Sequence, residues 1–129
     1  MDTNKNIDCI FCSIPEDRII RKYLNFFIIR DAFPVTYLHT LVISNRHVES
    51  YFDLYQDEID ELNSILNKEK NFLTSEDKLI TGFNIGINIG KDAGQTIMHT
   101  HIHLIPRRTN DVKKPKGGVR GVIPEKQAY

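Results

Sequence analysis

The stretch His99-Thr100-His101-Ile102-His103-Leu104-Ile105 is the most informative part of this sequence. Residues two apart on a strand project from one face, so the three histidines are expected on one side of a strand. Met98, Ile102 and Leu104 are then expected to face the core. A row of imidazoles packs no better than apolar residues would, so it indicates chemistry. Two chemistries use such a row: metal ligation by neutral imidazoles, and nucleophilic or acid–base catalysis by histidines that titrate near neutral pH.

The residues around this row favour a nucleophile over a catalytic metal. A metal-dependent hydrolase would usually add a carboxylate close to the His-x-His pair, and residues 104–107 contain none. The chain is also shorter than the large barrels that place such pairs in other hydrolases. Upstream lies a loop whose amides, hydroxyl and approachable backbone suit the binding of phosphate oxygens without a formal positive charge. The residues of this loop that carry the argument are Asn88, Gly90, Gly94, Gln95 and Thr96.

Length and charge limit the class of protein. The 129 residues suffice for one hydrophobic core, and we expect a single domain over residues 1–129. Seventeen Lys and Arg balance seventeen Asp and Glu, which argues against a nucleic-acid-binding protein, because such binding depends on a basic excess. Residues 1–8 are polar and do not resemble a signal peptide, and no apolar run reaches the roughly 20 residues that span a membrane. We therefore expect a cytoplasmic protein without membrane contact.

Apolar periodicity predicts several strands and one main helix. Strands are expected within residues 19–30, 39–44, 83–89 and 95–106. Apolar residues recur every three or four positions over residues 54–73, which predicts an amphipathic helix, with Asp53 placed to cap its start. These elements indicate an α+β fold. Residues 107–129 form a basic tail, which is either an ordered arm over the active site or a partner subunit, or a solvated segment.

The row of histidines resembles the signature of the histidine-triad (HIT) family, in which three histidines alternate with apolar residues. The resemblance covers most of residues 9–108 in the same order. It includes the opening Cys9-Ile10-Phe11-Cys12, the segment from Asp31 to His47, and the step Gly94-Gln95-Thr96 before the triad. Two positions depart from the pattern: Thr100 replaces an apolar residue, and Tyr37-Leu38 replaces a pair that is often Pro-Gly. Because the third histidine is present, the chain resembles the Hint-like branch.

This resemblance implies an antiparallel sheet with one long helix, a homodimer, and cleavage of purine nucleotides at the α-phosphate. The implied substrates are dinucleoside polyphosphates and nucleoside phosphoramidates. By position, His101 is the implied nucleophile, His103 contacts the phosphate, and His39 supports the site from behind. Asp31 is implied to bind the ribose hydroxyls. The implied residues around the phosphate are Asn88, Gly94, Gln95 and Thr96.

The expected mechanism passes through a covalent intermediate. A neutral His101 attacks phosphorus, with its other ring nitrogen held by a backbone carbonyl because the motif offers no acid. The product is a nucleotidyl-histidine that water hydrolyses. A protonated His103 would stabilise charge on the phosphoryl oxygens. Two alternatives stay open: phosphorolysis or nucleotidyl transfer, in which another acceptor replaces water, and a nucleotide-binding adaptor protein without turnover.

The two cysteines suggest a metal site. Cys9 and Cys12 have the spacing that lets both thiolates bind one Zn²⁺. Zinc-bearing relatives of the family imply His47 and His99 as the other two ligands, which would close a structural site. The alternative is a pair of reduced thiols, whereas a redox pair would need a thioredoxin-like context that is missing here. We expect structural zinc and no organic cofactor.

Overall fold

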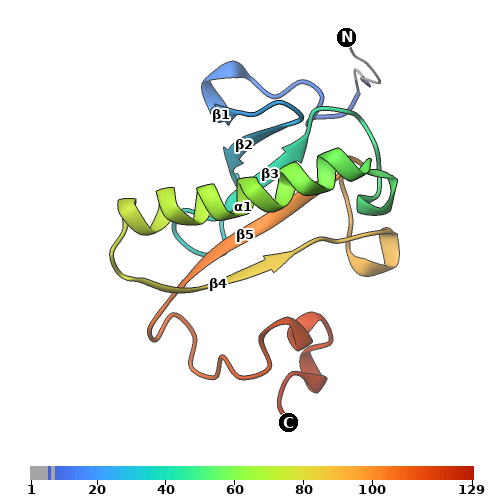
Figure 1. The fold of residues 1–129 in the computed structure, drawn as a ribbon. Coiled ribbons are helices and arrows are strands. Elements are labelled where there is room, and N and C mark those ends of the chain that lie inside the picture. Colours follow the sequence, from blue (N-terminus) through green and yellow to red (C-terminus); the bar gives the residue numbers. More distant parts are fainter. Residues whose placement is uncertain (1–5, 7) are drawn as a thin grey trace.

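The structure is a computed structural model that describes residue 6 and residues 8–129. The polar N-terminus expected over residues 1–8 lies largely outside the described residues. Five strands form one antiparallel sheet in the order β1-β2-β3-β5-β4, and one long helix, α1, crosses one face of it (Figure 1). The elements are β1 (Ile19–Lys22), β2 (Phe26–Arg30), β3 (Thr40–Ser44), α1 (Gln56–Glu76), β4 (Ile80–Gly86) and β5 (His101–Arg108). The expected α+β fold with an antiparallel sheet is confirmed.

The helix α1 forms because its apolar residues share one face, which packs on the sheet. Leu62 and Ile65 are buried against residues of β2, β3 and β5. The helix begins later than predicted, and Asp53 does not cap it. Residues 51–53 make a short 3-10 turn of their own, so Glu58 accepts the N–H of Tyr55 at the true helix start, with a distance of 2.8 Å.

The second face of the sheet carries a second apolar cluster. It contains Phe11, Phe27, Ile29, Leu41 and Ile43. Strands β2 and β3 are therefore buried on both faces, which explains why residues 26–29 and 41–43 are apolar without alternation. The N-terminal loop around Phe11 covers part of this face, and the space beside it holds the functional site.

Strands β4 and β5 differ from the predicted ranges. β4 starts at Ile80 and ends at Gly86, because the chain then leaves the sheet to form the loop over residues 87–100, although its alternating pattern continues to Ile89. β5 continues past Pro106 to Arg108, since Pro106 lies opposite Phe83 and the pairing resumes beyond it.

The tail is ordered in the structure and does not line the functional cavity. It contains 3-10 turns at Gly118–Val122 and Pro124–Lys126 and lies next to β4 (Figure 1). Arg120 holds the turns together by donating to the carbonyl of Lys126 at 2.7 Å. Gly117 has a φ of +91°, and an added Cβ would lie 2.1 Å from the carbonyl oxygen of Gln127, so only glycine fits there. Across the described residues, no helix is both long and apolar enough to cross a membrane.

Candidate functional site

The site is built on the strand β5, where histidines alternate with buried apolar residues. Ile102 and Leu104 pack toward α1 and are almost fully buried. His101 and His103 therefore point to the opposite face, into a cavity of about 380 Å³. Asp31, His39, Asn88, Gly94 and Thr96 line the same cavity. The structure thus brings most of the predicted catalytic and substrate-binding residues together.

One hydrogen bond fixes which nitrogen of His101 carries the proton. The Nδ1 atom lies 2.7 Å from the carbonyl oxygen of His99. A carbonyl only accepts, so Nδ1 must carry hydrogen and donate. In the neutral ring the lone pair is then on Nε2. The backbone carbonyl expected behind the predicted nucleophile is therefore that of His99, and the rings of Phe11 and His101 pack edge to face with centroids 4.9 Å apart.

Two linked hydrogen bonds give His103 the opposite tautomer to that of His101. The backbone N–H of Val35 donates to Nδ1 of His39 at 3.0 Å. Nε2 of the neutral His39 must then carry the proton, and it lies 2.9 Å from Nδ1 of His103. Because Nδ1 of His103 accepts this bond, its own proton is on Nε2. His101 therefore offers a lone pair from Nε2, whereas His103 offers an N–H.

Burial keeps His39 and His103 neutral. The pKa of His103 is lowered to about 4, first by burial and then by the neighbouring His101 and His39, while Asp31 opposes the shift. Burial also lowers the pKa of His39, with Asp31 again acting in the opposite direction. The lowered pKa disfavours the protonated form of His103, so near neutral pH this residue contributes a hydrogen-bond donor and no full charge.

Asp31 lies at the edge of the histidine chain and at the start of a loop. Its Oδ2 is 3.4 Å from Nε2 of His39 and 3.9 Å from Nδ1 of His103. Its Oδ1 accepts the N–H of Phe33 at 2.8 Å, which fixes the turn that follows β2. The carboxylate lines the cavity beside the imidazoles, where it can accept hydrogen bonds from a ligand.

Gln95 has a different position from the one expected. It is 5% exposed, its Nε2 donates to the carbonyl of Glu49 at 2.8 Å, and its Oε1 accepts the N–H of Gly90 at 2.8 Å. Gln95 therefore fixes the loop before the triad from inside and is not among the residues lining the cavity. Phe11, Phe33 and Val35 also line the cavity, although the sequence did not predict them as site residues. Each is an apolar residue close to a motif residue, and an apolar side chain alone does not indicate a ligand site.

His99 does not share the face of the other two histidines. β5 begins only at His101, and the preceding bend turns the His99 ring toward the cysteines. Met98 is likewise 37% exposed instead of buried in the core. The expected row of three imidazoles is therefore a pair, with the third residue assigned to another site.

The four predicted zinc ligands lie together. The donor atoms of Cys9, Cys12, His47 and His99 all fall within 4.8 Å of one another. Sγ of Cys9 and of Cys12 lie 3.4 and 3.5 Å from Nδ1 of His99, and Sγ of Cys12 lies 3.3 Å from Nδ1 of His47. Around a tetrahedral zinc, bonds of about 2.3 Å to sulfur and 2.0–2.1 Å to nitrogen separate such atoms by about 3.6 Å.

The outer contact of His99 also fits zinc. Its Nε2 lies 2.7 Å from the carbonyl of Ser44, so Nε2 carries the proton and Nδ1 presents its lone pair to the cysteines. Histidines that bind zinc usually donate their other N–H in this way. The donor set and its geometry therefore fit a closed Cys₂His₂ site.

A second group of possible metal ligands is better explained as a hydrogen-bond chain. The donor atoms of Asp31, His39 and His103 also lie within 4.8 Å of one another. A metal there would need the lone pair of His39 Nε2, which would move the ring proton to Nδ1. That nitrogen already accepts the N–H of Val35 at 3.0 Å, so two hydrogens would face each other. The amide of Val35 thus favours the hydrogen-bonded state.

Comparison with known proteins decides the family. Residues 13–110 match the model of the HIT domain. The chain belongs to the HIT domain family. An uncharacterized HIT-like protein from Saccharolobus solfataricus is 35% identical to this HIT domain over 107 residues, which cover 80% of this chain and 76% of the relative.

Solved structures of similar sequence share the fold. A Zn-bound histidine triad family protein from Mycobacterium smegmatis superposes on this HIT domain with a TM-score of 0.73 and 32% identity, covering 81% of this chain and 78% of that one. Plasmodium falciparum diadenosine triphosphate hydrolase gives a TM-score of 0.72 with 28% identity, covering 87% of this chain and 73% of that one.

Proposed function

We propose that this HIT domain hydrolyses nucleotides at the α-phosphate through a nucleotidyl intermediate on His101. The observation that carries the proposal is the bond between Nδ1 of His101 and the carbonyl of His99, which leaves the lone pair of a neutral imidazole on Nε2. The similar diadenosine triphosphate hydrolase supports a nucleotide substrate. Dinucleoside polyphosphates and nucleoside phosphoramidates of purines are the proposed substrates.

In the first step, Nε2 of His101 attacks phosphorus and forms a P–N bond. The bond from phosphorus to the leaving oxygen or nitrogen breaks, its electron pair stays on the leaving group, and a leaving nitrogen takes up a proton from solvent. The ring then carries a positive charge, which the carbonyl of His99 stabilises through the Nδ1–H that it already binds. Nε2–H of His103 donates to a phosphoryl oxygen and stabilises its charge.

In the second step, water attacks the same phosphorus. The P–N bond breaks, its electron pair returns to Nε2 of His101, and a proton of the water passes to solvent. The ring regains its original tautomer, because Nδ1–H remains bound to His99 throughout. Two steps with a labile phosphoramidate replace one slow displacement, which is the gain of covalent catalysis. Phosphorolysis or nucleotidyl transfer would differ only in the acceptor that replaces water here.

The rest of the cavity fits one nucleoside. Its floor is apolar and buried, formed by Phe11, Ile29 and Leu41, which suits the flat faces of a purine. Asp31 supplies the one carboxylate on the described cavity wall, and we assign it to the ribose hydroxyls. Asn88, Gly94 and Thr96 lie on the side of the loop before the triad, and we assign them to the phosphate.

Bound zinc would supply structural stability in this proposal. Cys9 and Cys12 would hold it with His47 and His99, which ties the N-terminal loop to the bend that precedes β5. The Zn-bound relative from Mycobacterium smegmatis supports this assignment. A cytoplasmic location belongs to the same proposal, because reduced thiols are what such a site needs.

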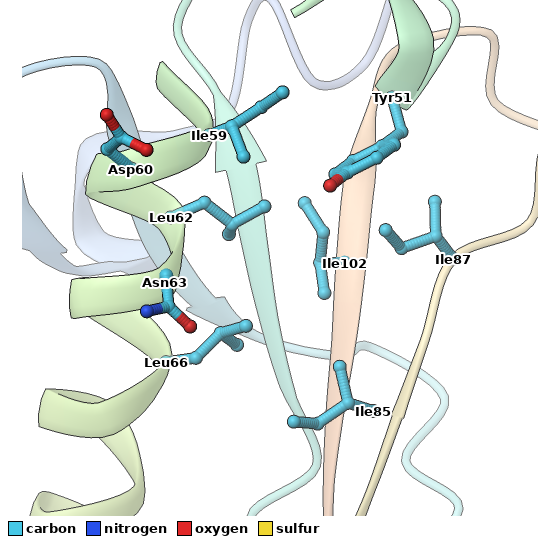
Figure 2. Close-up of a pocket in the computed structure, with 9 residues that line it drawn as sticks. All are labelled: Tyr51, Ile59, Asp60, Leu62, Asn63, Leu66, Ile85, Ile87 and Ile102. Carbon is cyan, nitrogen blue, oxygen red and sulfur yellow. The ribbon is translucent and has the colours of Figure 1, made fainter. Parts of the chain in front are cut away.

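We also propose a homodimer through the edge of the sheet at β4. A groove of about 560 Å³ separates α1 from β4, and apolar side chains face one another across it (Figure 2). Ile85, on the edge strand, is 51% exposed. A second copy would cover this side chain and the edge.

Light scattering should give a dimer mass for the wild type and a monomer mass for Ile85→Asp. Leu24→Asp, at an exposed residue between β1 and β2, is the control, and an unchanged mass for Ile85→Asp would contradict this interface.

The hydrolase proposal is tested by following AMP release chromatographically. Wild type should release AMP from diadenosine triphosphate or adenosine phosphoramidate, and His101→Ala should lose the activity while keeping its melting temperature. Rapid quenching in alkali should trap the nucleotidyl group on wild-type protein only. Near-wild-type turnover by His101→Ala would refute the nucleophile. Binding of AMP without turnover of either substrate would instead favour the adaptor alternative.

A further inference from the structure

The loop between β2 and β3 exposes apolar side chains at the mouth of the cavity. Phe33 is 88% exposed and Val35 is 71% exposed, yet both line the cavity. The proposed reaction at phosphorus uses neither side chain. Scattered exposed apolar residues are common, but a phenylalanine on the rim of a ligand cavity offers a flat apolar face to whatever leaves that cavity.

This loop is held rigidly although its side chains are exposed. The N–H of Asp31 donates to the carbonyl of His39 at 2.9 Å and closes the loop at its base. The N–H groups of Phe33 and Val35 donate to Asp31 and His39. The hydroxyl of Thr36 donates to the carbonyl of Pro106 at 2.7 Å. The backbone that carries Phe33 is therefore fixed by the same two residues that line the cavity, so the point from which the ring projects is held at the rim.

The volume of the cavity suits one nucleoside. Its volume of about 380 Å³ lies near the lower end of the usual range for ligand pockets, about 300–1,000 Å³. The buried floor of Phe11, Ile29 and Leu41 takes the nucleobase of the nucleotide that is attacked. In a dinucleoside polyphosphate the second nucleoside belongs to the leaving group, and it must lie outside this floor, past the rim.

We propose that Phe33 stacks on the second nucleobase of a dinucleoside polyphosphate and so selects this class of leaving group. The inference rests on the proposed function, because it takes the first nucleotide to occupy the cavity floor. Stacking uses the π-face that every base has, so the site selects for a second base without reading its identity. Val35, beside it on the rim, extends the apolar surface, and the rigid loop couples this site to Asp31 and His39.

Equilibrium binding tests this site without requiring turnover. In a His101→Ala background, dissociation constants are measured for AMP, ATP and diadenosine triphosphate, of which only the last has a second base. Phe33→Ala should weaken the binding of diadenosine triphosphate by about 5- to 150-fold, the usual effect of removing one stacking ring. AMP and ATP should bind as before. Phe33→Tyr should restore the affinity, and Phe52→Ala, at a phenylalanine that is 77% exposed and does not line the cavity, should change nothing.

Two results would overturn the stacking site. Equal weakening of all three nucleotides would place Phe33 against the first nucleoside or in a structural role. Unchanged binding of diadenosine triphosphate would show that the second base does not reach the ring. The proposed hydrolysis has its own test, and it fails if wild type releases AMP from no substrate. In that case the three dissociation constants still decide the role of Phe33.

Discussion

Acidification should destabilise this protein through His103, by an amount that its surroundings set. The folded state holds the pKa of this residue at about 4, against about 6.5 in an unfolded chain. Between these values the unfolded state binds the proton and the folded state does not, so stability falls as the pH drops through this window and is constant above it. Lowering the pH from 7 to 5 should therefore cost about 2 kcal/mol at this site.

The assay is urea denaturation of wild type and His103→Gln at both pH values. Glutamine keeps an acceptor for Nε2–H of His39 and cannot titrate, while contributions of groups that do not interact with His103 cancel in the comparison. The stability loss on going from pH 7 to pH 5 should be about 2 kcal/mol smaller in the variant than in wild type. An equal loss in the two proteins would refute the burial of a neutral His103 and the hydrogen-bond chain that accounts for it.

Three further predictions concern residues outside the reaction. Cys9→Ser removes one of the four proposed ligands, so zinc content by atomic emission and melting temperature should fall together; full zinc content in the variant would contradict the site. Arg21→Ala removes two of the three donors to the fully buried carboxylate of Glu69, at 2.8 and 2.9 Å, and leaves the hydroxyl of Tyr23 at 2.7 Å; urea denaturation should show a loss of about 3 kcal/mol, part of which Glu69→Gln should restore. Leu38 has a φ of +71°, so Leu38→Gly should be more stable than Leu38→Ala by about 1 kcal/mol in calorimetry, and the reverse order would show that this backbone is not strained.

The local pattern of the sequence predicted the elements better than their ends. The helix α1 was placed within a few residues, because three- and four-residue spacing has one physical cause, a buried face. Its start was missed, since residues 51–53 form a separate turn that no periodicity reveals. β4 was extended to Ile89 because alternation marks a half-buried strand and says nothing about where its partner ends. Strand ends depend on pairing, which is a tertiary property.

In the candidate site, too, the sequence predicted the residue types and their chemistry better than their positions. The histidines and the cysteines could be assigned to a reaction centre and a metal site because few residue types serve these chemistries. The sequence placed all three triad histidines on one face, whereas a bend before His101 gives His99 to the cysteines. Gln95 was expected beside the phosphate but lies inside the loop, and Phe33, for which no position was predicted, lies on the exposed rim of the cavity. Contacts between residues far apart in the sequence decide where these side chains lie, and a local pattern does not reveal such contacts.

The opposite roles of His101 and His103 depend on two backbone groups rather than on side-chain type. A carbonyl behind His101 forces its proton onto Nδ1 and its lone pair onto Nε2. An amide N–H behind His39 forces the reverse order through His39 to His103. If the group behind His39 were a carbonyl, His103 would present a lone pair and repel the phosphoryl oxygen of the proposed substrate. His39 is therefore needed because it links the N–H of Val35 to Nδ1 of His103 and so sets the tautomer of His103. This link explains why His39 is buried between the loop and the site.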